Sequence, residues 1–156
     1  MLNYNNHKII LNIRVLSTIE FLTRLVVAAI AGLIIGFERQ WHHKETGLKT
    51  NTLVAIGAAA FVLLSIKVAE TEANIDVTRI TAQVVMGVGF LGAGVIFREG
   101  DNVHGLNSAA TIWCSAAIGS IAASGYFLEA LICTFLVIGI NTVIEPIDNW
   151  LKNRKG

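Results

Sequence analysis

Residues 80–97 form a run of 18 uncharged residues with an arginine at each end, Arg79 and Arg98. As an α-helix, which rises about 1.5 Å per residue, this run reaches about 27 Å, close to the ~30 Å hydrocarbon thickness of a bilayer. The run therefore predicts a transmembrane helix. Its four glycines are Gly87, Gly89, Gly92 and Gly94. Glycine weakens a helix in water but lets backbones approach closely inside a membrane, so we expect this helix to pack tightly against others.

Three of these glycines also spell G-x-G-x-x-G, the fingerprint of dinucleotide-binding folds. That motif requires a strand before it, a helix opening after its last glycine and an acidic residue about 20 positions on. Here the apolar run continues unbroken to Phe97, and no βαβ pattern surrounds it. We therefore reject the nucleotide-binding interpretation in favour of helix packing.

The composition is that of an integral membrane protein. The 156 residues are 54% hydrophobic and 15% charged, with a mean hydropathy of +0.63, whereas soluble domains carry about 25% charged residues. A net charge of +1 gives no indication of a nucleic-acid partner. Cys114 and Cys133 lie in apolar runs, where free cysteine behaves as a small hydrophobe, so they predict neither a disulfide framework nor a metal site.

The hydropathy pattern predicts an all-α membrane protein, a bundle of five transmembrane helices in a lipid bilayer. The spans are expected at about residues 21–37, between Lys49 and Lys67, between Arg79 and Arg98, at 106–123 and at 127–144. Ser17 and Glu20 form an S-x-x-E capping box before the first span. Residues 124–126 mark the turn before the fifth span, and Pro146 is expected to end that helix.

The chain divides into three parts. Residues 1–19 form an N-terminal tail or a short helix lying on the membrane surface, and both alternatives stay open. This segment lacks the small-residue cleavage pattern of a signal peptide. Residues 20–145 form the transmembrane domain, and residues 146–156 form a short basic C-terminal tail.

The charges of the loops predict an orientation. Loop 38–50 and the C-terminal tail share one side and hold six lysines and arginines, against three on the other side when the arginines bordering the spans are left out. Lysine and arginine are enriched in cytoplasmic loops, so we expect a cytoplasmic C-terminus and an N-terminus outside.

Small residues recur at helix-contact spacing on the other spans too. Such positions permit close crossings driven by dispersion, and we expect a tight bundle, with a homo-oligomer as an open alternative. The glycines to which we assign packing are Gly32, Gly36, Gly57, Gly87, Gly89, Gly92, Gly94 and Gly119.

Polar side chains at membrane depth are costly and therefore candidates for function. Arg24 lies one turn past Glu20, and two interpretations stay open: snorkelling to the interface, or an internal ion pair with Glu20 or Glu99. Gln83 lies one turn inside the third span, where an amide suits packing and function equally well. Trp113 lies mid-span, away from the interfacial belt, where tryptophan more often fills space than binds a ligand.

The loop 38–45, with the sequence ERQWHHKE, contains paired histidines. Adjacent histidines point in different directions on a helix, and no further Cys or His set completes a zinc-like site. We therefore interpret this segment as a solvated basic loop without a metal. The chain has no nucleophile elbow, P-loop or H-E-x-x-H motif, so the sequence predicts no catalytic residue and no cofactor.

Four stretches of the chain resemble the MgtC/SapB family of bacterial inner-membrane proteins, in its five-helix membrane domain. They are RLVVAAIAGLIIGFERQ from Arg24, GLKTNTLVAIGAAAF from Gly47, RITAQVVMGVGFLGAGVIFREG from Arg79 and HGLNSAATIWCSAAIG from His104. They cover about residues 21–123 in family order.

The chain departs from the family pattern at two places. The family usually has arginine at Lys49, which lacks the planar fork of arginine, and a pair of threonines at Asn107 and Ser108. Family members named MgtC also carry a soluble C-terminal domain similar to the ACT fold. The sequence up to Gly156 has no such domain, so we do not carry over the regulatory roles of that domain.

The resemblance implies a protein of the bacterial inner membrane linked to magnesium limitation, ion homeostasis and survival in host phagocytes. It also implies modulation of other membrane proteins, including the F-type ATP synthase. The positions that carry the family pattern, and that we take as candidate functional residues, are Arg24, Glu38, Arg39, Lys49, Thr50, Gln83, Arg98, Asn107 and Trp113.

Two functions remain open at this point. One is a non-enzymatic modulator whose glycine-lined helices dock on a partner membrane protein or on a second copy. The other is a small ion transporter or channel with a polar path lined by Arg24, Gln83 and Arg98. Such a path suits an anion better than magnesium, which needs oxygen ligands. An enzyme is disfavoured, because no catalytic constellation is present.

Overall fold

The computed structural model describes residues 16–71 and 75–153, with side chains described up to residue 144. In chain order the elements are α2 (Thr18–Trp41), α3 (Leu48–Ala69), α4 (Thr78–Val95), β1 (Phe97–Glu99), β2 (Asn102–His104), α5 (Leu106–Ala123) and α6 (Phe127–Asn153). All five helices are long and apolar enough to cross a membrane, which confirms the predicted five-span bundle. The N-terminal segment, predicted as a tail or interfacial helix, lies outside the described residues up to residue 15.

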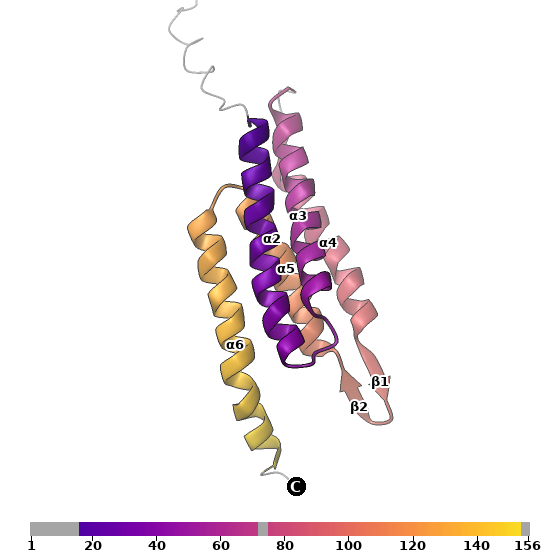
Figure 1. Ribbon diagram of the computed structural model, residues 1–156. Coiled ribbons are helices and arrows are strands. Elements are labelled where there is room, and N and C mark those ends of the chain that lie inside the picture. The colour runs from indigo at the N-terminus through magenta and orange to yellow at the C-terminus, as the bar shows by residue number, and fades with distance from the viewer. Residues whose placement is uncertain (1–15, 72–74, 154–156) are drawn as a thin grey trace, which may run out of the picture.

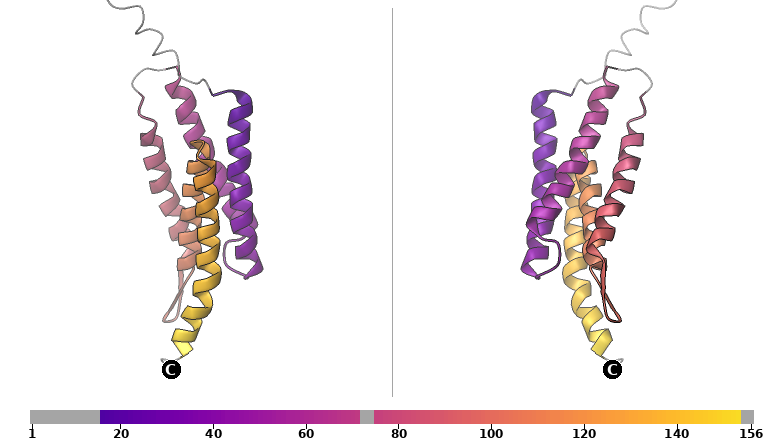
Figure 2. Two further views of the ribbon diagram at one scale, coloured as in Figure 1. Left: turned by 90° about the vertical axis from the view of Figure 1, so that its left-hand side faces the viewer. Right: turned by 90° about the vertical axis from the view of Figure 1, so that its right-hand side faces the viewer.

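The bundle has two ends that we name from Figure 1. The upper end holds the start of α2, the end of α3 and the turn between α5 and α6. The lower end holds the loop between α2 and α3, the β1–β2 hairpin and the end of α6. Helix α5 is the centre, because the other four helices all contact it. Figure 2 shows α4 at the margin of the bundle in both views.

Three glycines lie at close helix crossings. A Cβ at Gly32 would fall 2.8 Å from the carbonyl oxygen of Asn51, and one at Gly36 would fall 2.6 Å from the Cα of Leu48. A Cβ at Gly119 would overlap the backbone of Ala55. These positions let the backbones of α2, α3 and α5 touch, where a larger residue would force the helices apart.

The other predicted packing glycines have no such role in the single chain. A Cβ at Gly57, Gly87, Gly89 or Gly94 would meet nothing within 4 Å, and one at Gly92 would make only ordinary contact with Ala109. The reason is the marginal place of α4, of which only Val88 and Gly92 are buried. The expectation of a tightly packed third span is therefore wrong within this chain.

Two element boundaries also differ from the prediction. Helix α4 ends at Val95, and residues 97–104 form a hairpin in which Phe97 pairs with His104 and Glu99 with Asn102. Gly100 takes a positive φ of 61° in its turn, a conformation that glycine adopts at no steric cost. Helix α6 continues through Pro146 to Asn153, so this proline does not end the helix as predicted. A proline removes one backbone hydrogen bond, and here it lies beyond Ile144, the last residue of the apolar span.

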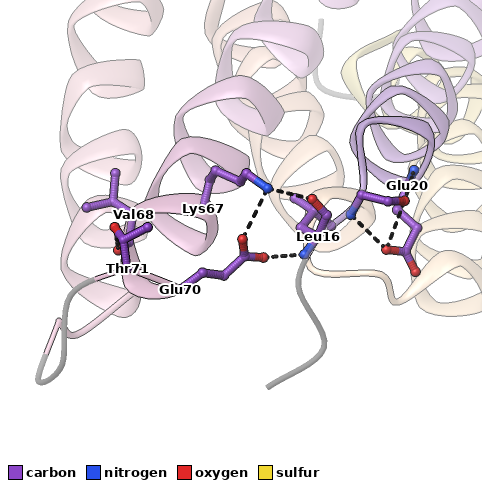
Figure 3. A network of polar contacts seen from close by, with 7 residues as sticks. Leu16, Glu20, Lys67, Val68, Glu70 and Thr71 are labelled. Atoms are coloured by element: carbon purple, nitrogen blue, oxygen red, sulfur yellow. Dashed lines mark hydrogen bonds and ion pairs between the residues drawn. The ribbon is translucent and has the colours of Figure 1, made fainter. Parts of the chain in front are cut away.

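A polar clamp joins α2 to α3 at the upper end (Figure 3). The Nζ of Lys67 donates to the carbonyl oxygen of Leu16 at 2.7 Å and lies 3.1 Å from Oε2 of Glu70. The other carboxylate oxygen of Glu70 accepts the N–H of Leu16. The next turn carries the predicted capping box, in which Ser17 and Glu20 exchange hydrogen bonds of 3.1 Å. The start of α2 is thereby tied to the end of α3.

The clamp predicts a pH dependence of stability. The Leu16 N–H, and after it Lys67, hold the pKa of Glu70 below its usual value of 4.5. Because this pKa is lower in the folded chain than in the unfolded one, the stabilisation is fully present above the unfolded value and is lost as the pH falls through the folded value. We expect the detergent melting temperature of the parent to fall as the pH drops below the usual glutamate pKa of 4.5, and Glu70→Gln to flatten that fall. The exposed hairpin variant Glu99→Gln is the control and should keep the parental profile; equal profiles for Glu70→Gln and the parent would contradict the clamp.

Candidate functional site: a buried polar network

Polar side chains from four helices and one loop gather inside the bundle near its lower end. We call this group the lower polar network; its members are Glu38, Arg39, Glu45, Thr46, Asn51, Ser108, Thr111, Ser115 and Asn141. All but Glu45 are buried, and Arg39 has no exposed surface at all. Charged groups are costly to bury unless they are paired and hydrogen-bonded, so their geometry decides whether the network is a stable unit.

Ser108 bridges two opposite charges. The Nη2 of Arg39 donates to the Ser108 hydroxyl at 3.1 Å, and that hydroxyl donates to Oε2 of Glu45 at 2.5 Å. The Ser108 hydroxyl is the main cause that lowers the pKa of Glu45, followed by the Glu45 backbone N–H and by the charges of Arg39 and Lys44. The end of α2, the following loop and the start of α5 are thus joined through one hydroxyl group.

Glu38 is the second charged centre of the network. Its Oε2 accepts from Nδ2 of Asn141 on α6 at 3.3 Å, and the same Nδ2 lies 3.5 Å from the hydroxyl oxygen of Thr111 on α5. Its Oε1 lies 3.1 Å from Nδ1 of His42, a contact that becomes an ion pair when the imidazole is protonated. The Glu38 side chain is 8% exposed. The Glu38 carboxylate therefore joins α2 to α6 directly, and Asn141 extends this link to α5.

Asn51 links α3 to the same region. Its Nδ2 donates to the carbonyl oxygens of Gly47 at 3.0 Å and Thr46 at 3.4 Å, while its Oδ1 accepts from the Ser115 hydroxyl at 2.9 Å. The amide thus ties α3 to the two carbonyl groups that precede it and also reaches across to α5. Asn51 and Ser115 are both fully buried.

The prediction of a solvated loop at residues 38–45 is therefore wrong for its first two residues. Helix α2 extends to Trp41, and its buried face runs through Ala28, Gly32 and Ile35 to Arg39. These spacings of four, three and four residues define one helix face. The same spacing can be read from the sequence, but the charge of Arg39 argues for solvent when it is considered alone.

The other predicted residues are dispersed. At the upper end the Nη1 of Arg24 donates to the carbonyl oxygen of Ala123 at 2.9 Å. A cation at that place stabilises the carbonyl end of α5, where the helix dipole is negative. The alternative of an ion pair with Glu99 is wrong, because Glu99 lies in the hairpin at the lower end.

Arg98 and Gln83 also lie outside the network. Arg98 is exposed in the hairpin, where it donates to the Gly100 carbonyl at 2.8 Å and pairs with Asp101 at 3.3 Å. Gln83 is exposed on α4 and lines an open groove against α3. Lys49, Asn107 and Trp113 are exposed as well, and Thr50 is half-buried. Only Glu38 and Arg39, of the nine candidates, belong to the network.

Seven members of the network were missed by sequence reasoning. They are uncharged hydroxyl and amide residues in apolar spans, apart from Glu45 and Thr46 in the loop. Asn51 and Asn141 are polar residues in otherwise apolar segments, and an intramembrane amide is a signal for an interhelical hydrogen bond. That signal was available in the sequence, although the partners were not.

The contacts of the network join one helix to another through hydrogen bonds. Among the described residues no group of three or more His, Cys, Asp or Glu side chains is placed to hold a metal ion. The fold and the network together define a small polytopic membrane protein whose buried charges join its helices. The family-level comparison agrees: the chain belongs to the MgtC family, whose model matches residues 25–150.

Individual relatives support the same assignment. The chain is 50% identical over 128 residues to the MgtC protein of Brucella abortus, a match that covers 82% of the chain and 52% of that protein. It is 48% identical over 125 residues to the MgtC protein of Salmonella typhimurium, covering 80% and 52%. An uncharacterized protein of Synechocystis is 47% identical over 135 residues, covering 86% and 56%. The chain spans about half the length of these relatives, and no solved structure matches it.

The network predicts different costs for two buried serines on α5. Ser115 donates across to Asn51, whereas Ser120 donates to the Ala116 carbonyl of its own helix. Ser115→Ala leaves the side-chain Oδ1 of Asn51 buried without this donor, which should lower the free energy of unfolding by about 1–3 kcal/mol. Ser120→Ala should lower it by less than about 1 kcal/mol. Reversible unfolding in mixed micelles measures both variants. Equal destabilisation would show that the hydrogen bond between α3 and α5 contributes nothing.

Proposed function

We propose that this chain is a non-enzymatic protein of the bacterial inner membrane that acts in ion homeostasis under magnesium limitation by binding and modulating partner membrane proteins. The family resemblance supports the link to magnesium and names the F-type ATP synthase as a candidate partner. The residues that would act in this role are those of the lower polar network, with Glu38 and Arg39 as its charged centre on α2.

The observation that carries the proposal is the separation of the polar residues expected to line a transport path. Arg24 bonds the end of α5 at the upper end, and Arg98 lies in the hairpin at the lower end. The groove lined by Gln83 includes neither arginine. A path needs its polar groups along one passage, whereas these three side chains occupy three separate places.

The network offers a poor direct site for magnesium. Mg²⁺ demands near-octahedral oxygen coordination and usually keeps several waters, bound through one or two carboxylates. Glu38 is a buried acidic side chain of this network. However, one oxygen of its carboxylate accepts from Asn141 and the other faces His42. His42 caps the same helix as Glu38, so it is the bond to Asn141 that favours a role for Glu38 in holding α2 against α6.

Growth and flux together test the proposal. In a bacterium lacking its own gene of this family, the parent should restore growth in low magnesium. Glu38→Gln should fail at equal membrane abundance, because it removes the buried negative charge at nearly constant volume. The control Glu99→Gln changes an exposed carboxylate of the hairpin and should restore growth fully.

The purified parent in liposomes should show no magnesium flux with a fluorescent indicator. Robust uptake by the protein alone would refute the modulator and favour the transporter. Full complementation by Glu38→Gln would remove the network from the functional site while leaving the family role open.

The orientation is part of the same proposal, with the lower end in the cytoplasm. The bias of six lysines and arginines against three supports it. With Cys114 and Cys133 changed to serine, an impermeant thiol reagent added to intact cells should label Tyr126→Cys at the upper turn and leave Lys44→Cys in the lower loop unlabelled. The reverse labelling pattern would invert the orientation.

A further inference from the structure

A groove about 550 Å³ in volume runs between α3 and α4 on the face of the bundle away from α2 and α6. Its lining includes Leu53, Gly57 and Phe61 from α3, and Gln83, Gly87 and Leu91 from α4. No charged side chain of the described residues lines it. The groove lies outside the lower polar network and has no part in the function proposed above.

The surface of the groove alternates hollows with ridges. A Cβ at Gly57 or Gly87 would meet nothing within 4 Å, so these positions form open hollows. Beside them, Leu53 and Phe61 are more than half exposed. Where glycines serve the fold of this chain, at Gly32, Gly36 and Gly119, another backbone fills the space. Glycine destabilises a helix, and close packing against another helix offsets this cost better than contact with mobile lipid tails does. Hollows of this kind are therefore characteristic of helix interfaces.

Gln83 adds a polar group to this apolar surface. It lies on the second turn of α4 and makes no hydrogen bond with any residue in the described part of the chain. Polar side chains facing a membrane interior gain stability by bonding across helices. A primary amide both donates and accepts, so two copies of the same amide satisfy each other across a two-fold axis.

We propose that this groove is the interface of a symmetric dimer of this chain, with the two-fold axis parallel to the membrane normal. Gln83 pairs with the Gln83 of the second copy, and Phe61 of each copy enters the hollow that Gly57 and Gly87 leave in the other. Hollows and ridges on one surface are the self-complementarity that an isologous contact requires. The uncharged lining and the self-matching amide favour a second copy over a partner of opposite charge.

Cysteine crosslinking in membranes tests the position of the axis. In a background with Cys114 and Cys133 changed to serine, Gln83→Cys should form a disulfide-linked dimer on mild oxidation. Val85→Cys is the matched control, because it lies two residues along α4, about 200° around the helix, on the side facing α5. Equal crosslinking at both positions, or crosslinking of Gln83→Cys only to a different protein, would overturn the proposal.

A pair of glycine variants tests the hollows. Gly87 and Gly89 are both exposed on α4 with no neighbour within 4 Å of an added Cβ, but only Gly87 lines the groove. Energy transfer between donor-labelled and acceptor-labelled copies in liposomes measures association. Gly87→Leu should weaken it about tenfold or more, because the added side chain fills the hollow, and Gln83→Ala should weaken it about threefold.

Gly89→Leu should leave association unchanged. Equal effects of the two leucine variants would overturn the proposal. So would a parent that stays monomeric at high protein-to-lipid ratio while retaining lipid in native mass spectrometry, which would assign the groove to an acyl chain.

Discussion

Direct contact between the backbones of α2, α3 and α5 is the constraint on which the rest of the structure depends. Gly36 lets α2 meet the first turn of α3 at Leu48, and Gly119 lets α5 meet α3 at Ala55. These crossings bring Arg39, Asn51 and Ser108 within reach of partners of ordinary side-chain length. A Cβ at either glycine would push the helices apart. The donor–acceptor distances between them would then exceed the roughly 3 Å of a hydrogen bond. Close packing and polar bonding in this bundle are therefore one feature.

The charges of the lower polar network matter because they are bonded through neutral groups. Ser108 joins Arg39 to Glu45, and Asn141 joins Glu38 to α5 and α6. Removing one member of a buried charged pair costs more than the pair contributes, because the remaining charge is left in a low-dielectric interior. Such a network gives little net stability but resists rearrangement. This property fits a protein that presents a fixed shape to a partner better than one that opens a path.

Hydropathy was sufficient to predict the five helices and insufficient to predict their contacts. The fourth span was located at its observed bounds, Leu106–Ala123, because charge and turn residues delimit it. In a membrane the lipid-facing and buried faces are both apolar, so amphipathic periodicity does not reveal which face packs. The same glycine pattern therefore describes Gly32, which packs against α3, and Gly87, where an added Cβ would meet no described residue within 4 Å. The hairpin was missed because Ile96 and Phe97 continue the apolar run although the helix has ended.

The lower polar network shows the same limit for polar residues. The family resemblance identified Glu38 and Arg39 as candidate residues. Their burial was not predicted, because residues next to a charged loop are expected to be exposed to solvent. Asn51, Ser115 and Asn141 were missed because a single hydroxyl or amide in a span has no partner visible in the sequence. Their partners are 64 and 103 residues away along the chain. Only the crossing of α3 with α5, and of α6 with α2, brings these groups together.

Helix α4 stands apart from this rigid assembly in a way that follows from its residues. The upper clamp fixes α2 to α3, Arg24 fixes the end of α5, and the network joins α2, α3, α5 and α6. No member of these three groups comes from α4, within the described chain. Segments with few buried contacts open at lower free energy than the core that they border. The described structure thus has four helices joined by buried polar bonds. Helix α4 is held instead by apolar packing of Val84, Val88 and Val95 against α3 and α5, and by the hairpin that follows it. The same helix carries the exposed Gly87 and Gln83, and Gln83 makes no hydrogen bond with any described residue. A neighbouring molecule that packs against α4 would stabilise both.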